Sequence, residues 1–268
     1  MQKFFENWAD FLQETQKSVN FTDFVPKDSL NNKIWLSQNQ LKPQISAKLA
    51  EIAKNFLEDV GVGTILISDI TFTGSLANYN WSDYSDIDLH ILVDFDQIDE
   101  NTELVREFFR AKIGIWNRMH DIRIFDHEVE IYVQDDKEKH VSSGVYSIMR
   151  DRWLITPLKK EIDLDWNSVD MKYSMITKLI EDVETLFGTA RYDEAYEFAN
   201  KIKQKIRKFR KCGLETGGEY SIENLVFKML RRGGQLGKLS DIMLQSYDQM
   251  MSLQGDFARN WINFANSE

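Results

Sequence analysis

The spacing of hydrophobic residues follows two different periods in the first part of the chain. Apolar residues recur at the helical period from Ile45 to Val60, before Gly61 and Gly63 end the pattern. In residues 86–95 they occupy alternate positions, which is the period of a strand with one buried face. The pattern predicts, in order, a helix at 45–60, strands at 64–73 and 86–95, a helix at 103–119, and strands at 121–125, 128–133 and 145–149.

Beyond Pro157 the strand period stops and only helical spacing remains. The predicted helices cover 167–188, 192–212, 221–232, 238–253 and 256–266. Strands and helices followed by helices alone indicate an α+β protein of two domains. We therefore expect an N-terminal domain at 1–160, with a small mixed β-sheet flanked by helices, and an all-α C-terminal domain at 161–268.

The first forty residues carry one amphipathic element. One face of a predicted N-terminal helix holds Phe4, Phe5, Trp8, Phe11 and Leu12. Because the polar face of this helix is acidic, docking on the protein body is favoured over anchoring at a membrane surface. Residues 20–42 show little periodicity and predict an irregular segment with room for one short helix.

The composition is that of a globular protein. Hydrophobic residues make up 43% and charged residues 28% of the 268 residues, which excludes a disordered or fibrous chain. Cys212 is the single cysteine, so neither an internal disulfide nor a CxxC zinc site is expected. No stretch approaches the roughly 18 apolar residues of a membrane span, and no secretory signal begins the sequence. We expect a cytoplasmic protein that does not contact a membrane.

The net charge of −10 is unevenly distributed along the chain. Residues 76–104 contain eight acids and no lysine or arginine, whereas residues 201–211 contain seven bases and no acid. Carboxylates that repel one another favour a bound cation, and a run of bases attracts phosphate groups. The first segment therefore suggests a metal site and the second a phosphate site.

The segment from Thr73 to Phe95 carries the clearest chemical signal. Gly74 and Ser75 form a turn after a predicted strand, where glycine lets the backbone approach a ligand and serine can donate to phosphate oxygens. After a spacer of ten residues, Asp86 and Asp88 lie on one face of the next predicted strand. Two such carboxylates can share divalent cations, and hard oxygen ligands suit Mg²⁺.

This combination resembles the pattern of the DNA polymerase β-like nucleotidyltransferase superfamily. Gly74, Ser75, Asp86 and Asp88 match its Gly-Ser turn and its Asp-hydrophobic-Asp strand. The sequence Ser-Asp-Ile-Asp-Leu is most similar to the motif of one branch of the superfamily. That branch contains poly(A) polymerases, oligoadenylate and cyclic-dinucleotide synthases, and antibiotic nucleotidyltransferases. The turn, the spacing and the carboxylate pair together are more specific than a lone Asp-x-Asp motif. The alternative interpretation of the two aspartates is an exposed strand with incidental acids.

The resemblance implies a third carboxylate on a later strand. Glu130 is the preferred residue because it interrupts an apolar run, where an unpaired charge is expensive. Glu128 is the alternative because it shares the same strand face. Asp86, Asp88 and Glu130 are thereby implied to be both the catalytic residues and the ligands of two Mg²⁺ ions, with Mn²⁺ as a substitute. His90 shares the face of the aspartates, but a hydrogen-bonded neighbour is favoured over a metal ligand.

The implied reaction moves a nucleoside monophosphate from a nucleoside triphosphate to an acceptor hydroxyl and releases pyrophosphate. Gly74 and Ser75 are the expected contacts of the triphosphate, and Lys201 and Lys205 are expected to neutralise it or an acceptor strand. A basic helix that only faces water is the alternative for these lysines. An acceptor on RNA or another nucleotide is preferred over a protein side chain or a small molecule, and over a module that binds nucleotides without turnover.

Overall fold

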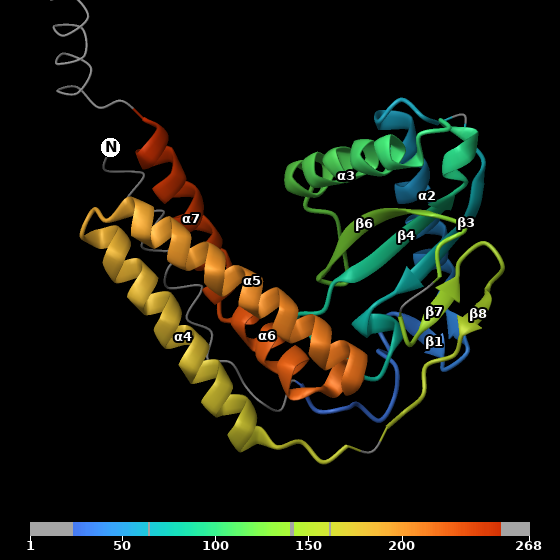
Figure 1. Cartoon of the computed structure of the whole chain (residues 1–268). Coiled ribbons are helices and arrows are strands. Elements are labelled where there is room, and N and C mark those ends of the chain that lie inside the picture. The colour runs from blue at the N-terminus through green and yellow to red at the C-terminus, as the bar shows by residue number, and fades with distance from the viewer. Residues whose placement is uncertain (1–23, 64, 140–141, 161, 253–268) are drawn as a thin grey trace, which may run out of the picture. The chain divides into compact units, whose positions relative to one another are not determined.

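The computed structural model describes residues 24–63, 65–139, 142–160 and 162–252, and the predicted helices at residues 4–12 and 256–266 lie outside this part. The chain divides between Ile162 and Asp163 into two compact units. We call the described residues up to Ile162 the sheet unit and those from Asp163 the helical unit (Figure 1). All strands of the described residues belong to the sheet unit. The α+β class predicted from the sequence is confirmed.

The sheet unit contains a six-stranded mixed sheet. In it, β4 and β6 run parallel to each other, and the other neighbouring pairs are antiparallel. The strands, in their order across the sheet, are β5 (Arg123–Ile124), β6 (His127–Asp135), β4 (Ile87–Val93), β3 (Ile67–Thr73), β7 (Val145–Ser147) and β8 (Arg152–Ile155). The central pair, β3 and β4, is joined through the segment that carries the Gly-Ser turn and the acidic motif.

One face of this sheet forms the hydrophobic core. Along β4, Ile87, Leu89 and Ile91 are fully buried, as the alternating pattern predicts. Two helices contribute to the same core, α2 (Pro43–Asp59) and α3 (Thr102–Met119) (Figure 1). Pro43 suits the first turn of α2 because proline lacks the N–H that this turn leaves without a helical partner.

The opposite face of the central strands is polar. The intervening residues of β4 are Asp88, His90 and Leu92, and those of β6 are Glu128, Glu130, Tyr132 and Gln134, of which only Leu92 is aliphatic. In the parallel pairing, Asp88 is registered with Glu130 and His90 with Tyr132. Because paired residues share a face, the register brings the predicted acids of two distant segments side by side.

The prediction of an irregular segment at 20–42 is wrong at its C-terminal end. This region contains a short hairpin of β1 (Trp35–Ser37) and β2 (Gln40–Leu41). Trp35 is buried, stacks on Phe72 with ring centroids 5.6 Å apart, and stacks on Trp153 at 4.7 Å. Aromatic packing between distant residues holds the hairpin and β8 in place. Their strands are two to four residues long, which is too short for a strand period to appear in the sequence.

The helical unit consists of four long helices and one short turn of 3₁₀ helix. They are α4 (Trp166–Gly188), α5 (Tyr192–Thr216), η4 (Gly218–Tyr220), α6 (Ile222–Arg232) and α7 (Gln235–Met251). Asp165 caps α4 by accepting a hydrogen bond from the Ser168 amide at 3.0 Å. Ala195, Ala199, Ile202 and Ile206, which recur at helical spacing along α5, are buried. In the part of the chain that the structure describes, we find no helix with the length and apolar content needed to cross a bilayer.

Candidate active site

The turn after β3 brings its backbone directly against the first acidic strand. Gly74 has φ +77° and ψ −161°, a conformation that essentially only glycine adopts without strain. A Cβ atom at Gly74 would lie 1.7 Å from Oδ2 of Asp88. Glycine is therefore required at position 74 both by the backbone conformation and by the nearby Asp88 carboxylate.

Ser75 connects this turn to the residue that precedes Asp86. Ser75 is the first residue of the short helix η2 (Ser75–Ala77), and its hydroxyl donates to the hydroxyl of Ser85 at 2.8 Å. The Ser85 carbonyl in turn accepts a hydrogen bond from Nδ1 of the buried His127 at 2.7 Å. The Gly-Ser turn, the start of β4 and the start of β6 are thus fixed to one another by short polar contacts.

Four carboxylates lie at this end of the parallel strands. Asp88 is registered with Glu130, and Ile87 with Val129, so continuing the pairing places Glu128 beside Asp86. Asp86 lies one residue before β4, and the predicted strand start is therefore one residue too early. We call Asp86, Asp88, Glu128 and Glu130 the turn-side acids.

The electrostatics around Glu128 favour a neighbouring positive charge. Burial and the neighbouring charge of Asp86 raise the pKa of Glu128 above its ordinary value. Arg123, whose Nη2 lies 3.9 Å from the Glu128 carboxylate, lowers this pKa but does not reverse the shift. Crowding of like charges raises carboxyl pKa values in this way, and a bound cation would relieve it.

Glu130 has a specific hydrogen-bond donor. The hydroxyl of Tyr132 donates to Oε2 of Glu130 at 2.5 Å. Burial and the nearby carboxylates raise the pKa of Tyr132 well above its ordinary value, so its hydroxyl keeps its proton and remains a donor. The ring of His90 stacks on that of Tyr132, with centroids 4.9 Å apart, and its Nδ1 lies within hydrogen-bond distance of Oε1 of Gln134, at 3.2 Å.

The turn-side acids have the ligand chemistry that a hard divalent cation requires. All their donor atoms are carboxylate oxygens, which Mg²⁺ and Mn²⁺ prefer over nitrogen or sulfur. Gly74 leaves no side chain between the turn and the Asp88 oxygen. The donor chemistry of these residues therefore suits the expected metal ions. Among the described residues, however, no three of the turn-side acids have carboxylate oxygens within 4.8 Å of one another, as Asp94, Asp135 and Asp136 do.

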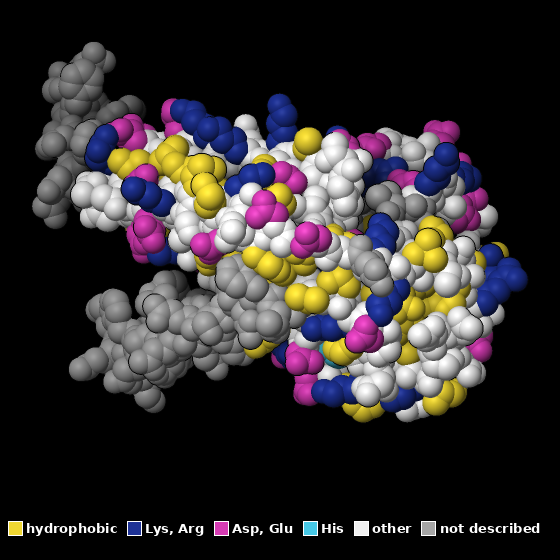
Figure 2. Space-filling model, turned by 90° about the horizontal axis from the view of Figure 1, so that it is seen from below, with side chains coloured by type: hydrophobic (Ala, Val, Ile, Leu, Met, Phe, Trp, Pro, Cys, Tyr) yellow, Lys and Arg dark blue, Asp and Glu magenta, His cyan; other side chains and the backbone are white. Residues whose placement is uncertain are grey.

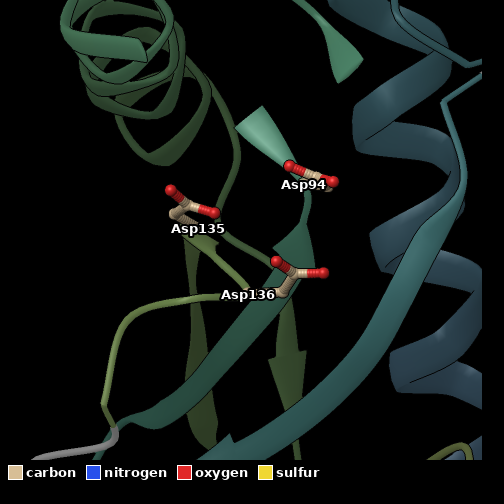
Figure 3. A group of neighbouring side chains, drawn as sticks. All are labelled: Asp94, Asp135 and Asp136. Atoms are coloured by element: carbon tan, nitrogen blue, oxygen red, sulfur yellow. The ribbon is translucent and has the colours of Figure 1, made fainter. Parts of the chain in front are cut away.

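A second acidic group lies at the other end of the same strands. Among the described residues, Asp94, Asp135 and Asp136 each offer an oxygen within 4.8 Å of the others (Figure 3). Six residues of strand separate Asp88 from Asp94, or about 20 Å at the usual rise of a strand. We call these three the loop-side acids; they are not among the site residues predicted from the sequence.

The loop-side acids are already supplied with donors by the protein. Nζ of Lys137 lies 2.6 Å from Oδ1 of Asp94 and 2.5 Å from Oδ2 of Asp96. The hydroxyl of Ser68 donates to Asp136 at 2.5 Å. Hydrogen bonding to Lys137 lowers the pKa of Asp94 below its ordinary value. The carboxylates could hold a cation, but a lysine ammonium already balances part of their charge.

The predicted phosphate contacts Lys201 and Lys205 lie on α5 in the helical unit. Both are exposed, and Nζ of Lys201 is 3.4 Å from a carboxylate oxygen of Glu197. On the face that Figure 2 shows, basic and acidic side chains of the described residues are interspersed. A nucleotide contact by these lysines stays a prediction.

The aromatic spacer between the Gly-Ser turn and Asp86 has a structural explanation. Asn78 and Tyr79 are buried, and the Asn78 amide donates to the hydroxyl of Ser143. Nε1 of Trp81 donates to the carbonyl of Ser29 at 2.8 Å, and its ring is half-buried against the core. These contacts pack the spacer into the sheet unit.

Tyr132, Ser85 and His127 support the site although the sequence analysis gave them no role. Tyr132 follows Glu130 by two residues, so strand alternation alone places it on the polar face. No comparable signal marks Ser85 and His127, which are 42 positions apart in the sequence and meet only on folding.

No family model and no curated protein matches this chain. Among solved structures, it is similar to a STING-associated c-di-GMP synthase, CdnE, from Capnocytophaga granulosa. The sequences are 15% identical, the match covers 79% of this chain and 83% of that one, and the TM-score is 0.20. Because this TM-score is too low to establish a shared fold, we interpret the site from the residues of this chain alone.

Proposed function

We propose that this protein is a metal-dependent nucleotidyltransferase that acts at the turn-side acids. It transfers the nucleoside monophosphate of a nucleoside triphosphate to an acceptor hydroxyl. The new bond joins the acceptor oxygen to the α-phosphorus, the bond from that phosphorus to the bridging oxygen breaks, pyrophosphate leaves, and the hydroxyl proton is released to water.

One observation carries the proposal. Gly74, Asp88 and Glu130, which come from three separate segments, are adjacent, through the close approach of Gly74 to Asp88 and the register of Asp88 with Glu130. An incidental pair of acids on a strand does not require a glycine whose Cβ would overlap one carboxylate. A glycine at this position lets the backbone come close to a phosphate chain beside the metal ligands.

The residues have distinct roles in this proposal. Asp86 and Asp88 bind the metal ions, and Glu130 completes the ligand set on the acceptor side. Gly74 and Ser75 orient the triphosphate through the backbone of the turn, since the Ser75 hydroxyl already donates its one proton to Ser85. When bound, the two Mg²⁺ ions lower the pKa of the acceptor hydroxyl and stabilise the negative charge of the departing pyrophosphate.

The proposed acceptor is RNA or another nucleotide, and α5 supports this choice. Lys205, Arg207 and Lys208 are exposed on this helix, within the run of bases at 201–211. Exposed bases at helical spacing can bind phosphate groups of an acceptor strand. The overall charge of −10 disfavours extensive contacts with a duplex, so a short or single-stranded acceptor fits better.

The test offers each of the four nucleoside triphosphates, alone and mixed, with Mg²⁺ or Mn²⁺, with and without total RNA. Pyrophosphate release is measured together with the masses of all products, for the wild type and for Asp88→Ala. We expect pyrophosphate release that Asp88→Ala abolishes.

The product masses identify the acceptor. Lengthened RNA or new short oligonucleotides support the proposed acceptor, whereas labelled protein or a labelled small molecule would replace it. Nucleotide binding without any pyrophosphate from the wild type would contradict the enzymatic function itself.

A further inference from the structure

A hydrogen bond orients the carboxylate of Glu130. Its Oε2 accepts the Tyr132 hydroxyl at 2.5 Å, and this commits one of its two oxygens. The second oxygen, Oε1, keeps its lone pairs for another partner. A glutamate side chain has three rotatable bonds, and repulsion from Asp88 and Asp86 would otherwise turn its charge away from them.

Tyr132 is itself held in place along the polar face of the sheet. Its ring stacks on His90 at 4.9 Å with an interplanar angle of 24°. Nδ1 of His90 lies 3.2 Å from Oε1 of Gln134, and because an amide oxygen only accepts, Nδ1 is the donor. Tyr132 is registered with His90, next to the pair of Glu130 and Asp88.

We propose that Tyr132 is a positioning residue for the metal site: its hydroxyl holds the Glu130 carboxylate through Oε2 and leaves Oε1 as the oxygen that binds a cation shared with Asp86 and Asp88. This inference rests on the proposed function and also assigns the third ligand. Glu128, the alternative third ligand, has Arg123 at 3.9 Å in place of a tyrosine donor. Residues that orient metal ligands through hydrogen bonds change metal affinity by about 10- to 100-fold when they are removed.

The variant Tyr132→Phe removes only the hydroxyl and keeps the ring that stacks on His90. The matched control is Tyr146→Phe, which removes a tyrosine hydroxyl that donates to the Asp151 carboxylate at 2.6 Å in the same sheet unit. Both variants lose one hydrogen bond to a carboxylate. A purely structural role of Tyr132 would therefore give both variants a lower melting temperature and an unchanged metal affinity.

The experiment measures Mn²⁺ affinity by electron paramagnetic resonance of the free ion, with the whole chain and a non-hydrolysable nucleoside triphosphate. We expect Tyr132→Phe to weaken Mn²⁺ binding by about 10- to 100-fold. Tyr146→Phe should bind Mn²⁺ as the wild type does. In a double-mutant cycle, Tyr132→Phe should change nothing further in the Glu130→Gln background, since the tyrosine acts through that carboxylate.

The outcomes separate this inference from the function on which it rests. If the wild type binds Mn²⁺ and Tyr132→Phe binds it equally well, the positioning role is wrong and the nucleotidyltransferase proposal stands. If Tyr132→Phe weakens binding equally with and without Glu130, the tyrosine does not act through Glu130. If the wild type binds no Mn²⁺ at the turn-side acids, both proposals fail together.

Discussion

The parallel strands β4 and β6 carry acids at both ends, and the protein balances the two groups differently. At the loop-side end, Lys137 lies within hydrogen-bond distance of Asp94 and lowers its pKa. At the turn-side end, burial and the charge of Asp86 raise the pKa of Glu128 in spite of Arg123. The two shifts have opposite signs because a lysine of the chain balances the charge of Asp94, whereas burial and the charge of Asp86 outweigh Arg123 at Glu128.

This difference teaches that closeness of carboxylates does not by itself identify a metal site. The loop-side acids have oxygens within 4.8 Å of one another, but they lie next to a lysine. The turn-side acids lie next to a glycine turn suited to a phosphate chain. The charge around a cluster and the ligand that can reach it are therefore better guides than its compactness.

The largest expected effect separates the two ends directly. Asp88→Asn should reduce pyrophosphate release by about 10²- to 10³-fold or more, because it removes a charged ligand from the site where negative charge develops. Asp94→Asn, the same change at the other end of β4, should leave the rate within about twofold, since it lies roughly 20 Å away along the strand. Equal losses of pyrophosphate release in the two variants would contradict the assignment of the active site to the turn-side acids.

The next largest effect tests the close approach of the Gly74 backbone to the Asp88 carboxylate. Gly74→Ala combines a disfavoured backbone conformation with a Cβ 1.7 Å from Asp88. Gly61→Ala is the matched control, since Gly61 has φ +80° and open space around its Cβ position. Both should lose about 1–3 kcal/mol of unfolding free energy from backbone strain.

Only Gly74→Ala should also lose Mn²⁺ affinity, which we would measure beside chemical denaturation curves of both variants. An unchanged Mn²⁺ affinity in Gly74→Ala would show that Asp88 is not a ligand in this geometry.

A smaller effect distinguishes the two glutamates of the turn-side end. Glu130→Gln should weaken Mn²⁺ binding, whereas Glu128→Gln should leave it nearly unchanged. Between the ordinary pKa of 4.5 and its raised value, Glu128 holds more protons in the folded than in the unfolded chain. Stability therefore falls as the pH rises through this window.

Without a metal, Glu128→Gln should thus be slightly more stable than the wild type at neutral pH, and this gain should disappear below pH 4.5. Melting temperatures across this pH range measure the difference. A loss of Mn²⁺ affinity in Glu128→Gln alone would exchange the roles of the two glutamates.

The smallest effect concerns the loop-side end. Lys137 lowers the pKa of Asp94 below 3.8, so this contact contributes stability above pH 3.8 that is lost as the pH falls through the folded pKa. Lys137→Gln should lower the melting temperature slightly at neutral pH, because exposed ion pairs contribute little.

The two proteins should converge in acid, and the Mn²⁺ affinity of the turn-side acids should not change. If Lys137→Gln created a second tight Mn²⁺ site, the loop-side acids would be a metal site that the lysine masks.

Much of this arrangement follows from local sequence. The strand β4 is predicted because one of its faces is buried, and that fact imposes the alternation of Ile87, Leu89 and Ile91. The Gly-Ser turn and the aspartate pair are close in sequence, so their spacing alone is enough to predict that they lie together. The order of the helices α4 to α7 follows from their apolar stripes in the same way.

Other parts depend on contacts between distant segments. Strand alternation places Glu128 and Glu130 on one face, and only the register of β6 with β4 sets Glu130 opposite Asp88. The short strands β1, β2 and β8 are held by tertiary packing around Trp35, which leaves no period in the sequence. The loop-side acids come together through the same register, with Asp135 paired to the last residue of β4.

The most direct test of the central claim is the position of Mn²⁺ in a crystal grown with Mn²⁺ and a non-hydrolysable nucleoside triphosphate, read from anomalous difference density. Our account predicts peaks between Asp86, Asp88 and Glu130, with the triphosphate extending toward Gly74 and Ser75. Peaks confined to Asp94, Asp135 and Asp136, or a nucleotide bound away from the Gly-Ser turn, would contradict it.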